Sequence, residues 1–194
     1  MRRGMLCVPM MMTALLLTGC GGGKLSETEQ MAYDLRDRYA EVTQYSTSVS
    51  LTADYGSTVF RCEMDVTAEG GQTALTLTAP DSLSGMTVHL REGESQLEYE
   101  ELMLDTGPLD ENGLTPVNAV PILVETAGTG LVTATSMTDD GLLRVEYGEP
   151  DVEPGEGRSV SLWVEPDSGA LVRGEISSDG TRVITCEFTD FIVG

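Results

Sequence analysis

Apolar and polar side chains alternate in short runs along most of the chain after residue 45, for example over residues 49–53 and 60–66. Successive side chains of a β-strand point to opposite faces of its sheet, so each run predicts a strand with one apolar and one polar face. Pairs such as Gly70-Gly71 separate the runs and supply the positive φ that tight hairpins need. The pattern predicts an antiparallel meander of eleven strands, which begin near residues 46, 58, 72, 86, 95, 102, 131, 142, 159, 170 and 181.

A first helix is predicted before the strands. Ser26 and Glu29 have the spacing of a capping box, in which each side chain accepts a hydrogen bond from the other residue's backbone amide. Apolar residues then recur every three or four positions, which predicts an amphipathic helix over residues 26–44. Its apolar face consists of Met31, Leu35, Tyr39 and Val42.

A second helix is predicted in the middle of the chain. Thr115 suits an N-cap, and Pro116 suits the first helical position because proline has no amide hydrogen to satisfy there. Pro121 is expected to kink this helix or to delay its start, and Gly128 and Gly130 are expected to end it. Its apolar residues are Val117, Val120, Leu123 and Val124.

The amino end has the layout of an export signal. Arg2 and Arg3 are followed by an uncharged, largely apolar run over residues 5–18, which is too short to span a bilayer comfortably. The motif LTGC ends at Cys20 and matches the bacterial lipobox. We therefore expect a signal peptide over residues 1–19, removal of that segment, and lipidation of Cys20 by palmitate-like acyl chains.

After this cleavage, residues 20–25 would form a lipidated, glycine-rich tether and residues 26–194 one folded domain. A five-residue tether reaches at most about 17 Å, so the domain would remain close to the membrane. The protein would lie on the outer face of the cytoplasmic membrane, or on the outer membrane of a cell that has two. Nine basic and 32 acidic residues would remain, a net charge of −23, which excludes nucleic acid as a partner.

Few side chains suggest catalysis or metal binding. Cys62 and Cys186 both fall among apolar strand positions, and the sequence leaves open whether they form a disulfide or remain buried thiols. His89, the only histidine, lies on the polar face of its predicted strand without a nucleophile motif nearby. No calcium-loop, zinc or nucleotide-binding spacing occurs, so we expect no enzyme activity, no metal and no cofactor.

The eleven predicted strands have more apolar surface than the two predicted helices can cover. Sheets of more than about ten strands curl or split, and eleven strands with one apolar face need a cover. Two short helices cover only part of such a face, and a large uncovered apolar surface usually binds something. A groove for an apolar ligand is therefore expected.

Two stretches suggest a family. The stretch APDSLSGMTVHLREGESQLEY, from Ala79 to Tyr99, contains strand, proline turn, strand, glycine turn and strand; SLWVEPDSGALVRGEI, from Ser161 to Ile176, is a hairpin with Trp163 before its turn. With the lipobox and the order of helices and strands, residues 26–193 resemble the LolA/LolB lipoprotein-carrier superfamily.

The resemblance implies a mostly β (α+β) fold, a half-open antiparallel barrel with the two helices as a lid. It also implies a cavity that holds acyl chains of lipids or lipoproteins, where carriers place an arginine; Arg61 is the nearest candidate, although its register points outward. The implied cavity residues are Val49, Leu51, Phe60, Met64, Leu75, Leu77, Met86, Val88 and Leu97. The implied lid residues are Met31, Leu35, Val42, Val120 and Leu123.

The leading hypothesis is a cell-envelope lipoprotein that binds or transfers acyl chains without catalysis. The alternative hypothesis is an envelope sensor or protein-interaction module with the same fold, no ligand cavity and an envelope protein as its partner.

Overall fold

The computed structural model describes residues 25–100, 102–108, 113–153 and 155–194. The predicted signal peptide, Cys20 and the tether up to residue 24 lie outside the described residues. In chain order the elements are α1 (Glu27–Ala40), β1 (Gln44–Asp54), β2 (Val59–Glu69), β3 (Gln72–Ala79), β4 (Thr87–Arg91), β5 (Glu94–Tyr99), β6 (Leu102–Pro108), α2 (Pro116–Thr129), β7 (Leu131–Met137), β8 (Leu143–Gly148), β9 (Arg158–Val164), β10 (Leu171–Ser178) and β11 (Thr181–Val193). No helix in these ranges is long and apolar enough to cross a membrane.

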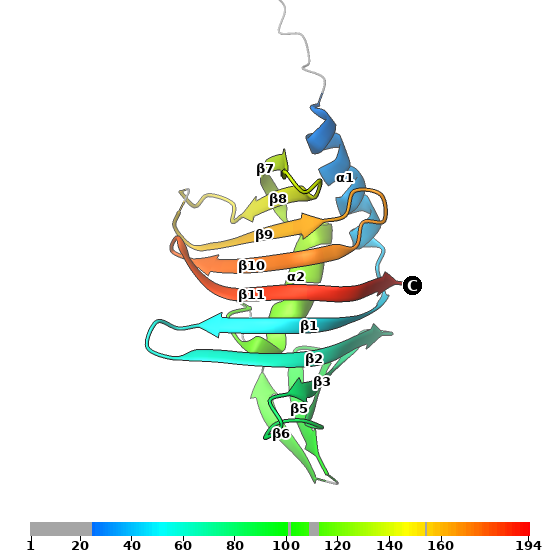
Figure 1. Cartoon of the computed structure of the whole chain (residues 1–194), viewed down its shortest axis with the longest axis vertical. Coiled ribbons are helices and arrows are strands. Elements are labelled where there is room, and N and C mark those ends of the chain that lie inside the picture. The colour runs from blue at the N-terminus through cyan, green and yellow to red at the C-terminus, as the bar shows by residue number, and fades with distance from the viewer. Residues whose placement is uncertain (1–24, 101, 109–112, 154) are drawn as a thin grey trace, which may run out of the picture.

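All eleven strands form one antiparallel sheet, in the order β6-β5-β4-β3-β2-β1-β11-β10-β9-β8-β7. The first and last strands are neighbours at the centre, so β6 and β7 are the two edges and the sheet does not close into a barrel. Strands β8, β9, β10, β11, β1 and β2 form one layer in front of α2 in Figure 1. Strands β3 to β6 turn away at the lower end of this layer. Each predicted strand start is confirmed within two residues.

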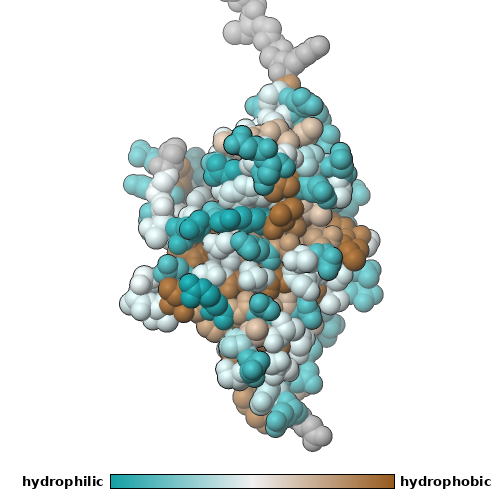
Figure 2. All heavy atoms as spheres, in the orientation of Figure 1, coloured by the Kyte–Doolittle hydropathy of each residue, from teal (hydrophilic) through white to brown (hydrophobic). Residues whose placement is uncertain are grey.

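The register places the apolar side chains on one face of the sheet. Val49 on β1 pairs with Met64 on β2, which pairs with Leu77 on β3; Leu75 pairs in turn with Val88 on β4. Directly paired residues of antiparallel strands share a face, so these side chains form the concave, covered surface. The opposite face is largely polar, and Figure 2 shows scattered hydrophobic residues there rather than one continuous apolar patch.

Helix α1 begins as predicted and ends early. The Ser26 hydroxyl accepts a hydrogen bond from the Glu29 amide at 3.2 Å, and the Glu29 carboxylate accepts one from the Ser26 amide at 2.7 Å, so the capping box is confirmed. The helix ends at Ala40 instead of residue 44, because β1 already pairs with β2 from Gln44 onward. Val42 therefore follows the helix, although it still packs against the core.

Helix α2 starts at Pro116 and continues through Pro121, so the predicted delay does not occur. Gly130 caps its end as predicted, but the prediction that Gly128 would end it is wrong, because Gly128 lies inside the helix. A Cβ at Gly128 would lie 2.8 Å from the Ala40 backbone nitrogen and the Tyr39 carbonyl carbon. Glycine at this position thus allows α1 and α2 to pack backbone against backbone.

Cys62 and Cys186, the two cysteines of the described residues, are both buried free thiols. Cys62 on β2 and Cys186 on β11 pair with the same residue of the strand between them, Leu51 on β1. Two strand spacings separate them, about 10 Å, which exceeds the roughly 7 Å that a disulfide spans. Burial raises the pKa of the Cys62 thiol to about 11 and raises that of Cys186 further, so both thiols stay protonated at neutral pH.

Candidate functional site

The nine predicted cavity residues lie along β1 to β5, mostly on the concave face, and most are packed. Val49, Leu51, Met64, Leu75 and Val88 are at most 6% exposed. Phe60, Leu77 and Leu97 are half-buried against the same core, and Met86 is half-buried just before β4. These side chains line no enclosed apolar cavity among the pockets of the described residues, so their role in ligand binding remains a prediction.

Helix α2 fills the concave face over the central strands. The predicted lid residues Val120 and Leu123 are 0% exposed. A Cβ at Gly174 on β10 would lie 2.6 Å from Leu123 Cδ1, so a residue without a side chain lets α2 pack directly on the sheet. The predicted lid residues on α1 also face inward, since Leu35 is buried and Met31 is half-buried. Both helices lie over the apolar face, and α2 packs directly on the sheet at Gly174.

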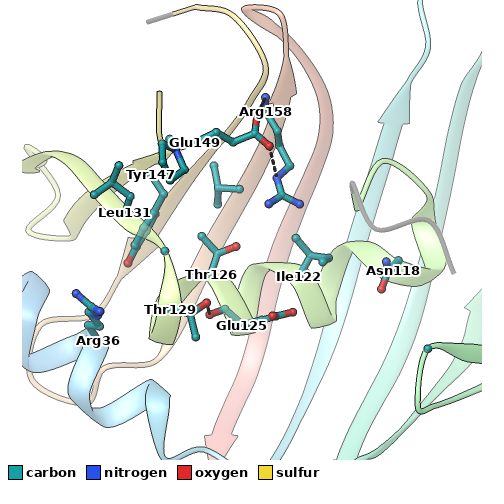
Figure 3. A pocket seen from close by; sticks show the side chains of 15 residues that line it. Arg36, Asn118, Ile122, Glu125, Thr126, Thr129, Leu131, Tyr147, Glu149 and Arg158 are labelled. Carbon is teal, nitrogen blue, oxygen red and sulfur yellow. Dashed lines mark hydrogen bonds and ion pairs between the residues drawn. The ribbon is translucent and has the colours of Figure 1, made fainter. Parts of the chain in front are cut away.

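An open cleft lies beside α2, between the helix and the β8–β9 end of the sheet. Its floor is the helix face that carries Ile122 and Thr126, and its walls come from α1, the start of β7, the end of β8 and the start of β9 (Figure 3). Its volume is about 670 Å³, within the range of roughly 300–1,000 Å³ that is usual for small-molecule sites. The lining residues are Arg36, Gly93, Asn118, Ile122, Glu125, Thr126, Thr129, Gly130, Leu131, Tyr147, Gly148, Glu149, Pro150, Arg158 and Val160.

The cleft has mixed polarity. Ile122, Leu131 and Val160 supply apolar surface, and Thr126 and Thr129 on α2 supply hydroxyls. At one wall, Arg158 Nε lies 3.9 Å from Glu149 Oε1, and the Arg158 amide donates a 3.1 Å hydrogen bond to Glu149 Oε2. Such a lining suits a molecule that has both apolar and polar parts.

Arg36 and Tyr147 lie at the end of the cleft where α2 terminates. Arg36 is exposed on α1 and makes no hydrogen bond or ion pair within the described ranges. Tyr147 on β8 is 2% exposed, and its hydroxyl is buried without a hydrogen-bond partner in this part of the structure. Burial raises the pKa of Tyr147 well above its usual value, and the nearby Arg36 charge acts in the opposite direction.

His89 lies on the polar side of β4, as predicted, and its Nε2 is 2.8 Å from Glu98 Oε2. It lines a wider hollow of about 950 Å³ along β3 to β5, whose lining is mostly polar or charged. In the parts of the chain that the structure describes, no three His, Cys, Asp or Glu side chains lie together in a way that suits a metal ion.

Sequence reasoning missed the cleft. None of its lining residues is among the nine predicted cavity residues. The apolar periodicity of α2 marks its buried stripe, whereas the cleft is built from the mixed face beside that stripe. The available signal was the spacing of Asn118, Ile122, Thr126 and Thr129, which repeats every three or four residues next to the apolar stripe.

No protein-family model matches the chain, and no characterised protein matches it in sequence. Solved structures resemble it with low sequence identity. One is an uncharacterised conserved protein from Thermus thermophilus, 11% identical over 85% of this chain and 86% of that one, with a TM-score of 0.49. A LolA superfamily protein from Nitrosomonas europaea is 11% identical over 84% and 93%, with a TM-score of 0.43. Lipoprotein LppX from Mycobacterium tuberculosis is 15% identical over 86% and 96%, with a TM-score of 0.44. The matches span most of the chain and include the superfamily that the sequence resembles.

Proposed function

We propose that this protein is a membrane-anchored lipoprotein of the bacterial cell envelope that binds amphiphilic molecules, such as lipids or the acyl chains of lipoproteins, without catalysis. The observation that carries the proposal is the open cleft of about 670 Å³ over α2, with apolar and polar groups side by side. The cleft replaces the space beneath α2 as the binding site, because α2 packs directly on the sheet there.

The energetics favour an alkyl chain in this cleft. Each methylene removed from water contributes about 0.8 kcal/mol, so about ten buried methylenes supply the roughly 8 kcal/mol of micromolar binding. Ile122 and Val160 provide apolar contacts from two different elements, and the open side leaves room for the rest of a larger lipid. Leu131, which lines the cleft and is 51% exposed, offers a position where a larger side chain would occupy the space without disturbing the core.

Photocrosslinking tests this proposal. The full-length protein in nanodiscs is irradiated with a diazirine-bearing dodecanol, and labelled peptides are mapped. Wild-type protein is expected to carry the label on α2 and the β8–β9 segment, and Leu131→Trp is expected to reduce labelling several-fold by filling the cleft.

The matched control is Val59→Trp, at a residue of β2 that is 42% exposed and lies outside the cleft. It adds the same ring to a strand surface and is expected to leave labelling unchanged. Absence of label from the wild-type cleft, or equal loss in both variants, would contradict binding at this site.

A second function is favoured by the sheet edge at β6. Tyr99, Leu102, Met103 and Leu104 are between 42% and 59% exposed, at or beside a strand that has a neighbour on one side only. Such an edge accepts a strand from another protein, and exposed apolar side chains strengthen the pairing. The protein would then act as an interaction module for an envelope protein.

Crosslinking in cells separates the two functions. If β6 binds a partner protein, a single crosslinked species is expected, and Leu102→Lys is expected to remove it because a charge would be placed at the apolar edge. Leu131→Trp is expected to leave that species intact. Loss of the species with Leu131→Trp alone would assign the partner to the cleft instead.

A further inference from the structure

At one end of the cleft, two hydrogen-bond donors, Arg36 and Tyr147, have no partner within the described residues. Arg36 is one of eleven basic residues in a chain with 32 acidic ones, and it has no ion pair within the described residues. The Tyr147 hydroxyl lacks a partner although the side chain is almost fully buried. An unsatisfied buried hydroxyl is unfavourable and uncommon in folded proteins, so its place beside a free guanidinium needs an explanation.

The acidic side chains of the cleft do not supply that partner. Glu149 is held by Arg158 at the opposite wall. Glu125 belongs to the same face of α2, but its carboxylate points away from Arg36 (Figure 3), and no ion pair joins the two. The Arg36 end is therefore free to receive an acceptor group from outside the protein.

We propose that Arg36 and Tyr147 form the head-group subsite of the cleft and select amphiphiles with a carboxylate or phosphate head. The inference rests on the proposed function and specifies its ligand class. The guanidinium donates hydrogen bonds to the anionic oxygens, and the Tyr147 hydroxyl donates another once neighbouring side chains shift to expose it. The alkyl tail extends along α2 from Thr129 towards Asn118, a floor of about 16 Å at 1.5 Å per residue.

A structural role for Arg36 makes a different prediction. The carboxyl end of α2 lies at this end of the cleft, and a cation near a helix C-terminus is favourable because of the helix dipole. If that were its only role, removing the charge would lower stability and leave ligand preference unchanged. Head-group selection, in contrast, changes the preference between acidic and neutral ligands of equal chain length.

The test is a competition experiment on the full-length protein in nanodiscs. Unlabelled dodecanoate or dodecanol displaces the photoreactive dodecanol from the cleft. Wild-type protein is expected to prefer dodecanoate by about tenfold, the size of one charge-assisted contact, and Arg36→Gln is expected to reduce that ratio to about one. Arg61→Gln removes an exposed arginine outside the cleft and is expected to keep the tenfold ratio.

Tyr147→Phe provides an independent readout. Because it removes a hydroxyl without a partner, the variant is expected to unfold at the same temperature as wild type or at a higher one, yet to lose about threefold of its preference for dodecanoate. A preference that survives both Arg36→Gln and Tyr147→Phe would overturn the head-group assignment.

Four further outcomes have distinct meanings. Equal displacement of the probe by dodecanoate and dodecanol from wild-type protein overturns the subsite and leaves the proposed function standing. Failure of the dodecanol probe to label the cleft at all contradicts the proposed function itself. If dodecyl phosphate competes as well as dodecanoate, the subsite accepts anionic head groups in general. If acetate or inorganic phosphate competes as strongly as dodecanoate, the subsite binds free anions, which contradicts an amphiphile site.

Discussion

Cells that express the Cys20→Ser variant are expected to incorporate no labelled palmitate into this protein, whereas wild-type protein becomes labelled. The reason is chemical, since the lipobox places the acyl-accepting sulfur at Cys20 and serine does not offer a thiol. One acyl chain gives only marginal membrane binding, and at about 0.8 kcal/mol per buried methylene two or three chains anchor a protein firmly. Loss of the label is therefore expected to accompany loss of a stable anchor, read by release of the mature domain from washed membranes.

The other cysteines provide the controls. Cys7 lies within the predicted signal peptide, so Cys7→Ser is expected to leave labelling of the mature protein unchanged. Cys62 and Cys186 are at most 4% exposed and stay protonated at neutral pH, so neither is an accessible acyl acceptor. Palmitate that remains on the Cys20→Ser variant would contradict the lipobox interpretation.

The strands could be predicted from the sequence because two local signals agree. Period-two alternation identifies each strand, and turn glycines mark where it ends; Glu92 and Gly93 both adopt positive φ in the turn from β4 to β5, as the pair predicts. Short hairpins also explain the order of β1 to β6 and of β7 to β11, but no hairpin joins β1 to β11 at the centre of the sheet. Helix ends were less predictable, because the pairing of β1 with β2 ends α1 before its periodic pattern runs out.

The candidate site could not be predicted in the same way. The apolar face of the sheet was correctly recognised, but the sequence does not show that Gly174 lets Leu123 fill the space above it. Arg36, Ile122 and Tyr147 come from three elements that are distant in the chain and share no pattern. Only the tertiary packing of α1 against α2 brings them to one cleft, and that packing depends on backbone contact at Gly128.

Close backbone contacts at Gly174 and Gly128 hold α2 in place between the sheet and α1. On one side the helix approaches β10 at Gly174, and on the other side α1 approaches the helix at Gly128. A helix held by both contacts behaves as part of the core, so the flank that carries Ile122 and Thr126 is a fixed floor for a ligand. A helix that moved as a lid would instead expose the apolar strands beneath it when a ligand enters.

Replacing Leu123 with alanine is expected to reduce the free energy of unfolding by about 3 kcal/mol or more, because Leu123 is 0% exposed and packs on Gly174. Ile122→Ala, at the neighbouring residue that faces the cleft, is expected to cost about 1 kcal/mol, since Ile122 is only half-buried. Urea unfolding of the full-length protein, followed by fluorescence of the single tryptophan, Trp163, measures both.

Ligand binding should rank the two variants in the opposite order. Ile122→Ala removes apolar surface from the cleft and is expected to weaken labelling by the dodecanol probe, whereas Leu123→Ala leaves the lining intact and is expected to retain it in the folded fraction. If Leu123→Ala cost less than about 1 kcal/mol and increased uptake of the probe, α2 would not be a fixed core element. The binding surface would then be the apolar strand face beneath the helix, with Leu51 and Leu75 at its centre.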